Sequence, residues 1–107
     1  MTRIPFEEMH ATVTAAFVNA GMNEADASTC ARVHTESSCD GVYSHGLNRV
    51  ARFVDYIGRG WIALDGRPAP VRRLGALEVH DGNFGPGILN ALFAIDRAQA
   101  IAAGQGV

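Results

Sequence analysis

Apolar residues recur with helical spacing in three segments of the first sixty residues. In residues 6–20 they return every three or four positions, which predicts a helix with one buried face that stops at Gly21. Asn23 is a suitable N-cap for a second helix over residues 24–38, because its side chain can accept a hydrogen bond from the first turn. A third apolar repeat predicts a helix that begins near Gly46 and ends at the glycines close to residue 60.

The rest of the chain has a weaker pattern. Residues 61–74 contain two prolines and show no regular period, so we expect an extended connector there. Alternating side chains at 76–80 predict a short strand, and residues 88–103 return to helical spacing. The predicted organisation is a helical region (6–60), a connector (61–74) and a strand-turn-helix unit (75–104).

This order of elements predicts an α/β fold in which three N-terminal helices precede a short strand and a helix. The chain ends in Gly-Gln-Gly-Val, which is typical of a turn that leaves a helix, with Val107 as the first residue of another strand. We therefore expect the fold to continue and these 107 residues to form the N-terminal portion of a larger protein.

Composition indicates a globular chain and argues against nucleic acid or a membrane surface as its partner. The residues are 48% hydrophobic and 19% charged, and the formal net charge is −2, so no broad basic surface serves nucleic acid or a membrane. No apolar stretch approaches the roughly 20 residues that a membrane helix needs. The first residues lack a secretory profile, so we expect a cytoplasmic protein in which Cys30 and Cys39 are reduced.

Two other patterns have both a functional and a structural interpretation. Gly85 and Gly87 precede a predicted helix and could expose amides to a dinucleotide phosphate, but Asn90 fills the third glycine position, which favours an ordinary turn. Cys30 and His34 share a helix face with zinc-ligand spacing, but no second pair completes four ligands, which favours burial. The sequence therefore assigns no cofactor-binding residue and no metal ligand.

The stretch GVYSHGLNR, residues 41–49, concentrates polar side chains between two predicted helices. His45 would lie at the start of the third helix, where the helix dipole disfavours the imidazolium and eases release of its proton. Arg49 could hold a substrate carboxylate in bidentate fashion, and Ser44 could cap the helix or bind a substrate oxygen. This arrangement suits an anionic, oxygen-rich small molecule. A capped helix start with a solvent-facing histidine and arginine explains the spacing equally well.

The sequence GVYSHGLNRVARF closely resembles the N-terminal motif of the malate/L-lactate dehydrogenase-like oxidoreductases, a family with a non-Rossmann fold. The likeness extends through the predicted opening helices and the strand-turn-helix unit, so it covers nearly the whole chain. It implies that His45 is the catalytic histidine, which protonates a ketone oxygen while a nicotinamide delivers hydride. It also implies that Ser44 and Arg49 border the substrate, with Arg49 at the carboxylate of a 2-keto acid.

The same resemblance implies properties of the whole enzyme. Within the family, the sequence most resembles members that reduce 2,3-diketo-L-gulonate. Malate, lactate and ureidoglycolate are the alternative substrates. NAD(P)H is the implied cofactor, NADH being favoured, and the family binds it mainly through later segments, so we expect these residues alone to be inactive. Family members are homodimers. A different possibility is a non-catalytic helical module that binds a partner through an exposed apolar surface.

Overall fold

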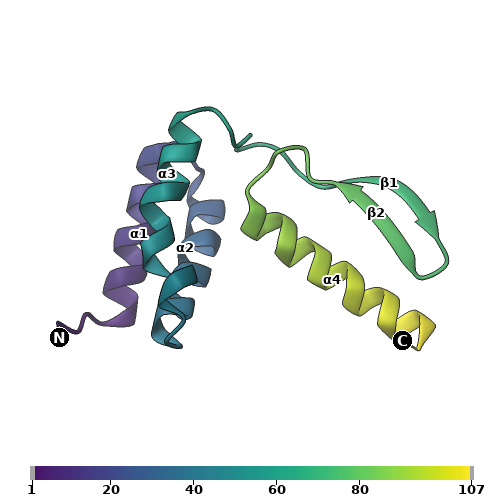
Figure 1. Cartoon of the computed structure of the whole chain (residues 1–107), viewed down its shortest axis with the longest axis horizontal. Coiled ribbons are helices and arrows are strands. Elements are labelled where there is room, and N and C mark those ends of the chain that lie inside the picture. Colours follow the sequence, from purple (N-terminus) through teal and green to yellow (C-terminus); the bar gives the residue numbers. More distant parts are fainter. Residues whose placement is uncertain (1, 107) are drawn as a thin grey trace. The chain divides into compact units, whose positions relative to one another are not determined.

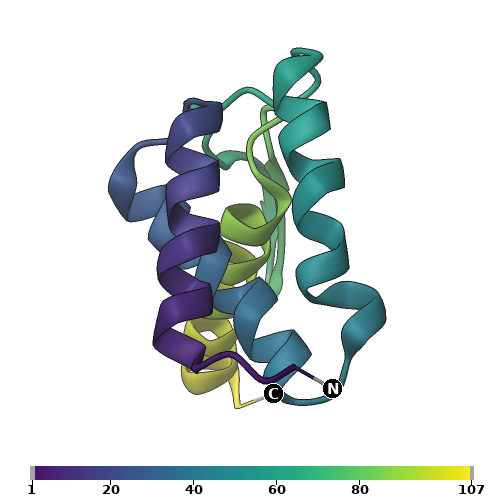
Figure 2. The same ribbon diagram turned by 90° about the vertical axis from the view of Figure 1, so that its left-hand side faces the viewer.

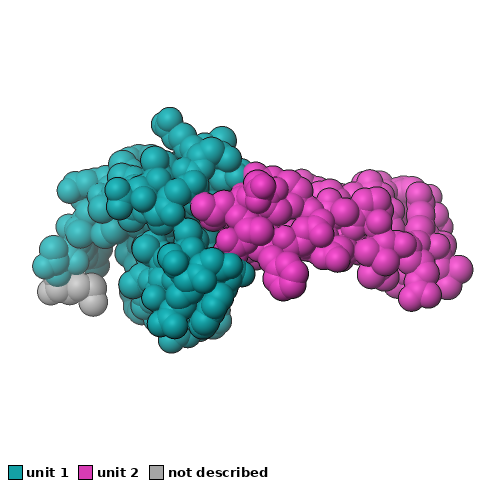
Figure 3. Space-filling view, turned by 90° about the horizontal axis from the view of Figure 1, so that it is seen from above, with its two compact units in different colours: residues 1–61 teal, residues 62–107 magenta. Residues whose placement is uncertain are grey.

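The computed structural model describes residues 2–106 and divides into two compact units, Met1–Trp61 and Ile62–Val107. Figure 1 shows the order of the elements, and Figure 3 gives each unit its own colour. The first unit contains three α-helices, and the second contains a two-stranded sheet and one α-helix. Helices and strands therefore occur in the predicted order, with one strand more than expected.

The first unit consists of three helices joined by short turns (Figure 2). α1 spans Phe6–Ala20, and α2 spans Glu24–Cys39, one residue beyond its predicted end. α3 is shorter than predicted and spans Val50–Gly58. Between α2 and α3 the chain makes two single 3-10 turns, η1 at Tyr43–His45 and η2 at Leu47–Arg49.

The connection from α1 to α2 follows the local sequence signals. Gly21 adopts a φ of 120°, which favours glycine, and its N–H closes the last turn of α1 on the carbonyl of Val18 at 3.0 Å. The Asn23 side chain accepts a hydrogen bond from the N–H of Asp26 at 2.9 Å. Both helix-end predictions are confirmed.

The core of the first unit lies where α1, α2 and α3 meet. Phe17 of α1 is fully buried, and its ring meets Phe53 of α3 edge-on with the centroids 5.1 Å apart. Burying such a side chain contributes about 1.5–3 kcal/mol. The remaining buried apolar residues are Val13, Met22, Ala27, Cys30, Ala31 and Ile57.

His10 on α1 is a buried polar residue of the same unit. It is 9% exposed, and its Nε2 donates a hydrogen bond to the carbonyl oxygen of Ser28 on α2 at 3.0 Å. A buried donor that finds a backbone acceptor in this way avoids the penalty of desolvation without a partner. His10 therefore has a structural role between the two helices.

The second unit is a β-hairpin followed by a helix. β1 spans Ala69–Leu74 and pairs antiparallel with β2, Leu77–Asp81, and α4 spans Gly87–Gln105. Gly75, in the two-residue hairpin loop, has a φ of 57°, which a glycine adopts readily. Among the helices in residues 2–106, none combines the length and the apolar character needed to cross a membrane.

The predicted connector over residues 61–74 is wrong in its second half, which forms β1. Nearly every β1 side chain is exposed, so the strand lacks the alternation that identifies a half-buried strand. Pro70 makes the strand harder still to predict from the sequence, since the register of the pairing shifts immediately after it. The predicted strand and last helix are present at 77–81 and 87–105, and the further strand expected at Val107 lies outside the described residues.

Glu78 of β2 joins the hairpin to α4. Arg97 of α4 donates two hydrogen bonds to this carboxylate. Its Nε lies 3.0 Å from Oε2, and a terminal amino group lies 2.6 Å from Oε1. His80, on the same face of β2, places Nε2 3.0 Å from Oε2. The hydrogen bonds from Arg97, and then that from His80, lower the pKa of Glu78 from 4.5 to about 2.

This lowered pKa predicts a loss of stability in acid. A carboxyl group whose pKa is lower in the folded state stabilises the fold fully above its unfolded pKa of 4.5, and this contribution is lost as the pH falls toward 2. We expect the unfolding temperature to decrease across this range, and Glu78→Gln to remove that part of the decrease. Thermal unfolding followed by circular dichroism measures it, with Glu8→Gln on α1 as the control. An unchanged pH dependence in Glu78→Gln would contradict the assignment.

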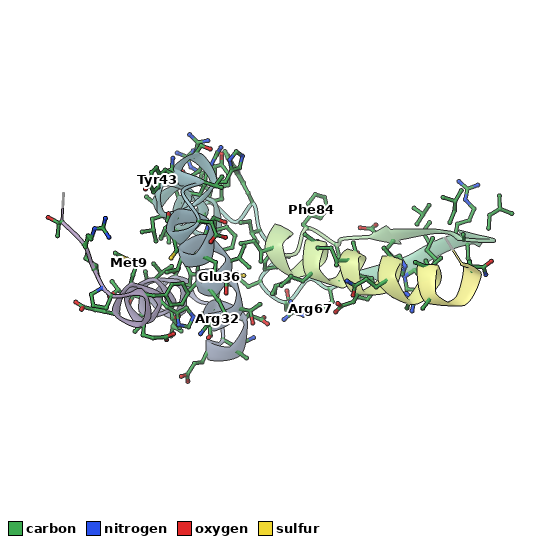
Figure 4. The ribbon with its side chains drawn as sticks, turned by 90° about the horizontal axis from the view of Figure 1, so that it is seen from below. Met9, Arg32, Glu36, Tyr43, Arg67 and Phe84 are labelled. Carbon is green, nitrogen blue, oxygen red and sulfur yellow. The ribbon has the colours of Figure 1, made fainter. Side chains whose placement is uncertain are left out.

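The turn between β2 and α4 holds a bulky residue in a strained conformation. The N–H of Gly85 bonds the carbonyl of Gly82 at 2.9 Å, and the central residues Asn83 and Phe84 have φ values of 50° and 56°. Asn83 tolerates this conformation, and its side chain donates to the carbonyl of Arg67 at 2.7 Å. Phe84 tolerates it poorly. The residue is 83% exposed, and Figure 4 labels its side chain.

Replacing Phe84 by asparagine is expected to stabilise the chain by about 1 kcal/mol, since the left-handed conformation costs a bulky residue about 1–2 kcal/mol. The exposed ring contributes little packing that could be lost. Urea unfolding at equilibrium measures the change. Phe84→Leu keeps the strain and serves as the control, so equal stability of the two variants would refute this explanation.

Candidate active site

The predicted site lies in the segment between α2 and α3, whose backbone is held by hydrogen bonds. The N–H of Val42 donates to the carbonyl of Ser37 near the end of α2 at 2.8 Å, and the N–H of His45 donates to Val42 at 3.2 Å. These bonds turn the chain back along α2. Figure 4 draws the side chains of this region and labels Tyr43, which is 65% exposed.

Gly46 brings this segment into direct contact with α2. A Cβ at this position would lie 2.9 Å from the backbone nitrogen of Ser38 and 3.0 Å from its Cα, too close for a side chain. The Ser38 hydroxyl accepts a hydrogen bond from the N–H of Leu47 at 2.8 Å. The backbone that follows His45 is therefore fixed on α2, and nothing in the hydrophobic pattern distinguishes Ser38 from its neighbour Ser37.

Ser44, His45 and Arg49, the three residues assigned to the site from the sequence, are connected to one another. The hydroxyl of Ser44 lies 2.9 Å from Nδ1 of His45. Nε of Arg49 donates to the carbonyl oxygen of Ser44 at 2.8 Å. His45 and Ser44 are exposed and Arg49 is half-buried. An imidazole and a guanidinium are thus held on one short segment at the surface.

The expected start of α3 near Gly46 is wrong, and with it the argument from the helix dipole. α3 begins at Val50, and the 3-10 turns η1 and η2 occupy the preceding residues. A regular helix from Gly46 cannot form here, because Gly46 has a ψ of −131° as it passes Ser38. Arg49 therefore reaches the site by bonding the backbone of Ser44 and not by lying one helical turn after His45.

His34 of α2 lies against this segment. Its sequence pattern favours burial over a zinc site and does not predict this contact. It is 8% exposed, and burial lowers the pKa of its imidazole. The backbone at His45 and Gly46 raises the pKa of His34, but by less than burial lowers it. The structure thus places a second histidine against the backbone that carries the first.

Gly85 of the Gly-Pro-Gly turn packs against the backbone of Gly66. A Cβ on Gly85 would lie 2.9 Å from the carbonyl carbon of Gly66, and the N–H of Gly85 is used by Gly82. Gly85 therefore serves the packing of the turn, whereas a Cβ on Gly87 would meet nothing within 4 Å. Within residues 2–106, no three side chains among His, Cys, Asp and Glu are grouped closely enough to hold a metal ion.

Comparison with known proteins identifies the family. Residues 4–107 match the family model described as malate/L-lactate dehydrogenase. The chain belongs to this family. It is 34% identical over 105 residues to the 2,3-diketo-L-gulonate reductase of Shigella boydii, a match that covers 98% of this chain and 32% of that protein. The chain therefore spans about a third of the length of the curated relatives it matches.

Solved structures of malate dehydrogenases confirm the fold. Malate dehydrogenase from Pyrococcus horikoshii matches 98% of this chain and 30% of its own with a TM-score of 0.92 and 26% identity. Malate dehydrogenase from Entamoeba histolytica matches 96% of this chain and 29% of its own with a TM-score of 0.86 at 21% identity, which supports the fold alone. The predicted family and its α/β fold are thus both confirmed.

Proposed function

We propose that this chain supplies the proton-donating part of an oxidoreductase that reduces a 2-keto acid to a 2-hydroxy acid. The observation that carries the proposal is the connected group of Ser44, His45 and Arg49, in a chain of the malate/L-lactate dehydrogenase family. His45 is the proton donor, Arg49 binds the substrate carboxylate, and Ser44 orients the imidazole.

The contact between Ser44 and His45 is compatible with both the charged and the neutral imidazole, the two states of a proton donor. When the imidazole is charged, Nδ1–H can donate to the Ser44 hydroxyl while Nε2–H points away from it, toward a substrate oxygen. Transfer of the Nε2 proton to a ketone oxygen leaves a neutral ring that keeps its Nδ1–H bond. The transfer thus needs no rearrangement of the ring, and a general acid must lie within hydrogen-bond reach of the atom it protonates.

Arg49 is suited to hold the substrate beside this proton. The bond from its Nε to Ser44 fixes the guanidinium and occupies only one of its five N–H donors. A guanidinium in a fixed position binds a carboxylate with directional, charge-assisted hydrogen bonds. A 2-keto acid bound in this way presents its ketone oxygen next to the carboxylate and therefore near His45.

The substrate, cofactor and assembly in this proposal come from the resemblance. The diketogulonate reductase relative supports 2,3-diketo-L-gulonate, reduced to 3-dehydro-L-gulonate, as the substrate, with malate, lactate and ureidoglycolate as alternatives. NAD(P)H, with NADH favoured, supplies the hydride when bound, through residues other than those described. The full enzyme is a cytoplasmic homodimer in this proposal, and the 107 residues alone are inactive.

Binding of the substrate to the chain itself tests the proposal. We expect 2,3-diketo-L-gulonate to shift the NMR signals of Ser44, His45 and Arg49, and the uncharged methyl ester of the same compound to have little effect. Arg49→Gln should abolish the response, and Arg59→Gln, at an exposed arginine paired with Asp55, is the control. A response that persists in Arg49→Gln, or that the ester reproduces, would refute the assignment of the carboxylate site.

A second candidate function, binding of a partner protein without catalysis, is favoured by the exposed apolar side chains of the hairpin. These residues are Val71, Leu74, Leu77 and Val79, each at least half exposed. An apolar surface of this kind is unusual for a monomer in solution. Light scattering and binding of a hydrophobic dye test this alternative. A monomer that binds little dye would argue against it.

A further inference from the structure

His34 has no part in the proposed reaction, although it lies directly below the segment that would carry it out. Its ring contacts Phe17 edge-on at 5.9 Å and Phe53 at 6.4 Å between centroids, and the residue is 8% exposed. An apolar ring would fill this position without burying two nitrogen atoms. A histidine here calls for an explanation other than packing.

The ring nitrogens of His34 are buried in the first unit, and the backbone of His45 and Gly46 affects the pKa of the ring. Both ring nitrogens are inaccessible to solvent, and neither has a hydrogen-bond partner of good geometry among residues 2–106. Buried polar atoms in this condition are rare in folded proteins. The backbone of His45 and Gly46 interacts with the ring and favours its protonation, as a carbonyl oxygen that faces an imidazole N–H does. Two buried nitrogens without a well-formed partner therefore lie in the part of α2 that underlies the site segment.

We propose that His34 is a positioning residue, whose buried imidazole supports the backbone at His45 and Gly46 and thereby fixes the direction of the His45 side chain. The proposal rests on the proposed role of His45. Ser38 supports the same backbone one residue later, through its bond to Leu47. α2 therefore holds the site from two successive turns, and His34 supplies the support nearest to His45.

Hydrogen exchange and imidazole NMR of the chain test this role. His34→Phe keeps the ring and removes the nitrogens, so we expect the amide of Leu47 to exchange about tenfold faster and His45 to lose its single side-chain conformation. His34→Gln retains a polar group and should restore part of the protection. His10→Phe makes the same change at the other buried histidine of this unit and should leave Leu47 within about twofold of the original rate.

The unmodified chain provides a measurement that does not depend on the stability of any variant. A slowly exchanging ring N–H on His34, with a nuclear Overhauser effect to the backbone of His45 or Gly46, is expected. Absence of that signal, or equal exchange of Leu47 in His34→Phe and His10→Phe, overturns the proposal. Neither measurement uses substrate, so a failure of the carboxylate-binding test above would leave the positioning role standing, and the converse also holds.

Discussion

Replacing His45 by alanine is expected to lower kcat for the reduction of 2,3-diketo-L-gulonate about 10²- to 10⁴-fold, the usual effect of removing a general acid. The assay needs a protein that also binds the nicotinamide. A chimera in which this chain replaces the matching third of the Shigella boydii reductase provides one. Loss of NADH absorbance measures the rate. We expect KM to change much less than kcat, since the proposed carboxylate site at Arg49 is unaltered.

The control for this experiment is His10→Ala in the same chimera. His10 is bonded to Ser28 of α2 and stacks against Phe6 of α1, so we expect its removal to lower the unfolding temperature and to leave kcat at lower temperatures unchanged. A loss below about threefold in His45→Ala would remove His45 from the mechanism, because general acids contribute far more.

Gly46→Ala is expected to destabilise the chain by about 1–3 kcal/mol, the usual effect of forcing extra atoms into a packed region. The added Cβ would lie 2.9 Å and 3.0 Å from backbone atoms of Ser38, which cannot rotate away as a side chain can. The segment has to move off α2, and the bond from Leu47 to Ser38 is lost with it. Urea unfolding reports the loss, and the amide exchange of Leu47 shows where it arises.

Gly58→Ala is a matched control at the end of α3. A Cβ at this position would meet nothing within 4 Å, so we expect this variant to be neutral or slightly more stable. If the two variants were equally stable, the close approach of Gly46 to α2 would not be what holds the site.

The sequence was sufficient to predict the elements whose signals are local. α1, α2 and their caps depend on a regular apolar face and on the chemistry of Gly21 and Asn23, and both helices occur where they were expected. β1 was missed because its side chains are nearly all exposed, so that its only signal is the pairing with β2. Pairing of this kind joins distant positions and leaves little trace in a hydrophobic pattern.

The candidate site also has a part that the sequence predicts and a part that it does not. Ser44, His45 and Arg49 were predicted as a group because they lie within six consecutive residues, and the structure shows them connected through the Ser44 hydroxyl and carbonyl. The contacts with α2 were not predicted. They depend on Gly46 passing against Ser38 and on the ring of His34, which no spacing rule reveals.

The short sequence separation of the bonds around Ser44 has a consequence for folding. The Arg49–Ser44 contact spans five residues and the Leu47–Ser38 contact spans nine. Loops of about ten residues close within about 10–100 ns, whereas a ribosome adds about 5–20 residues each second. The connected group of Ser44, His45 and Arg49 can therefore assemble while later residues are still being synthesised. A nascent chain arrested after α3 has left the exit tunnel would already hold His45 next to the Ser44 hydroxyl.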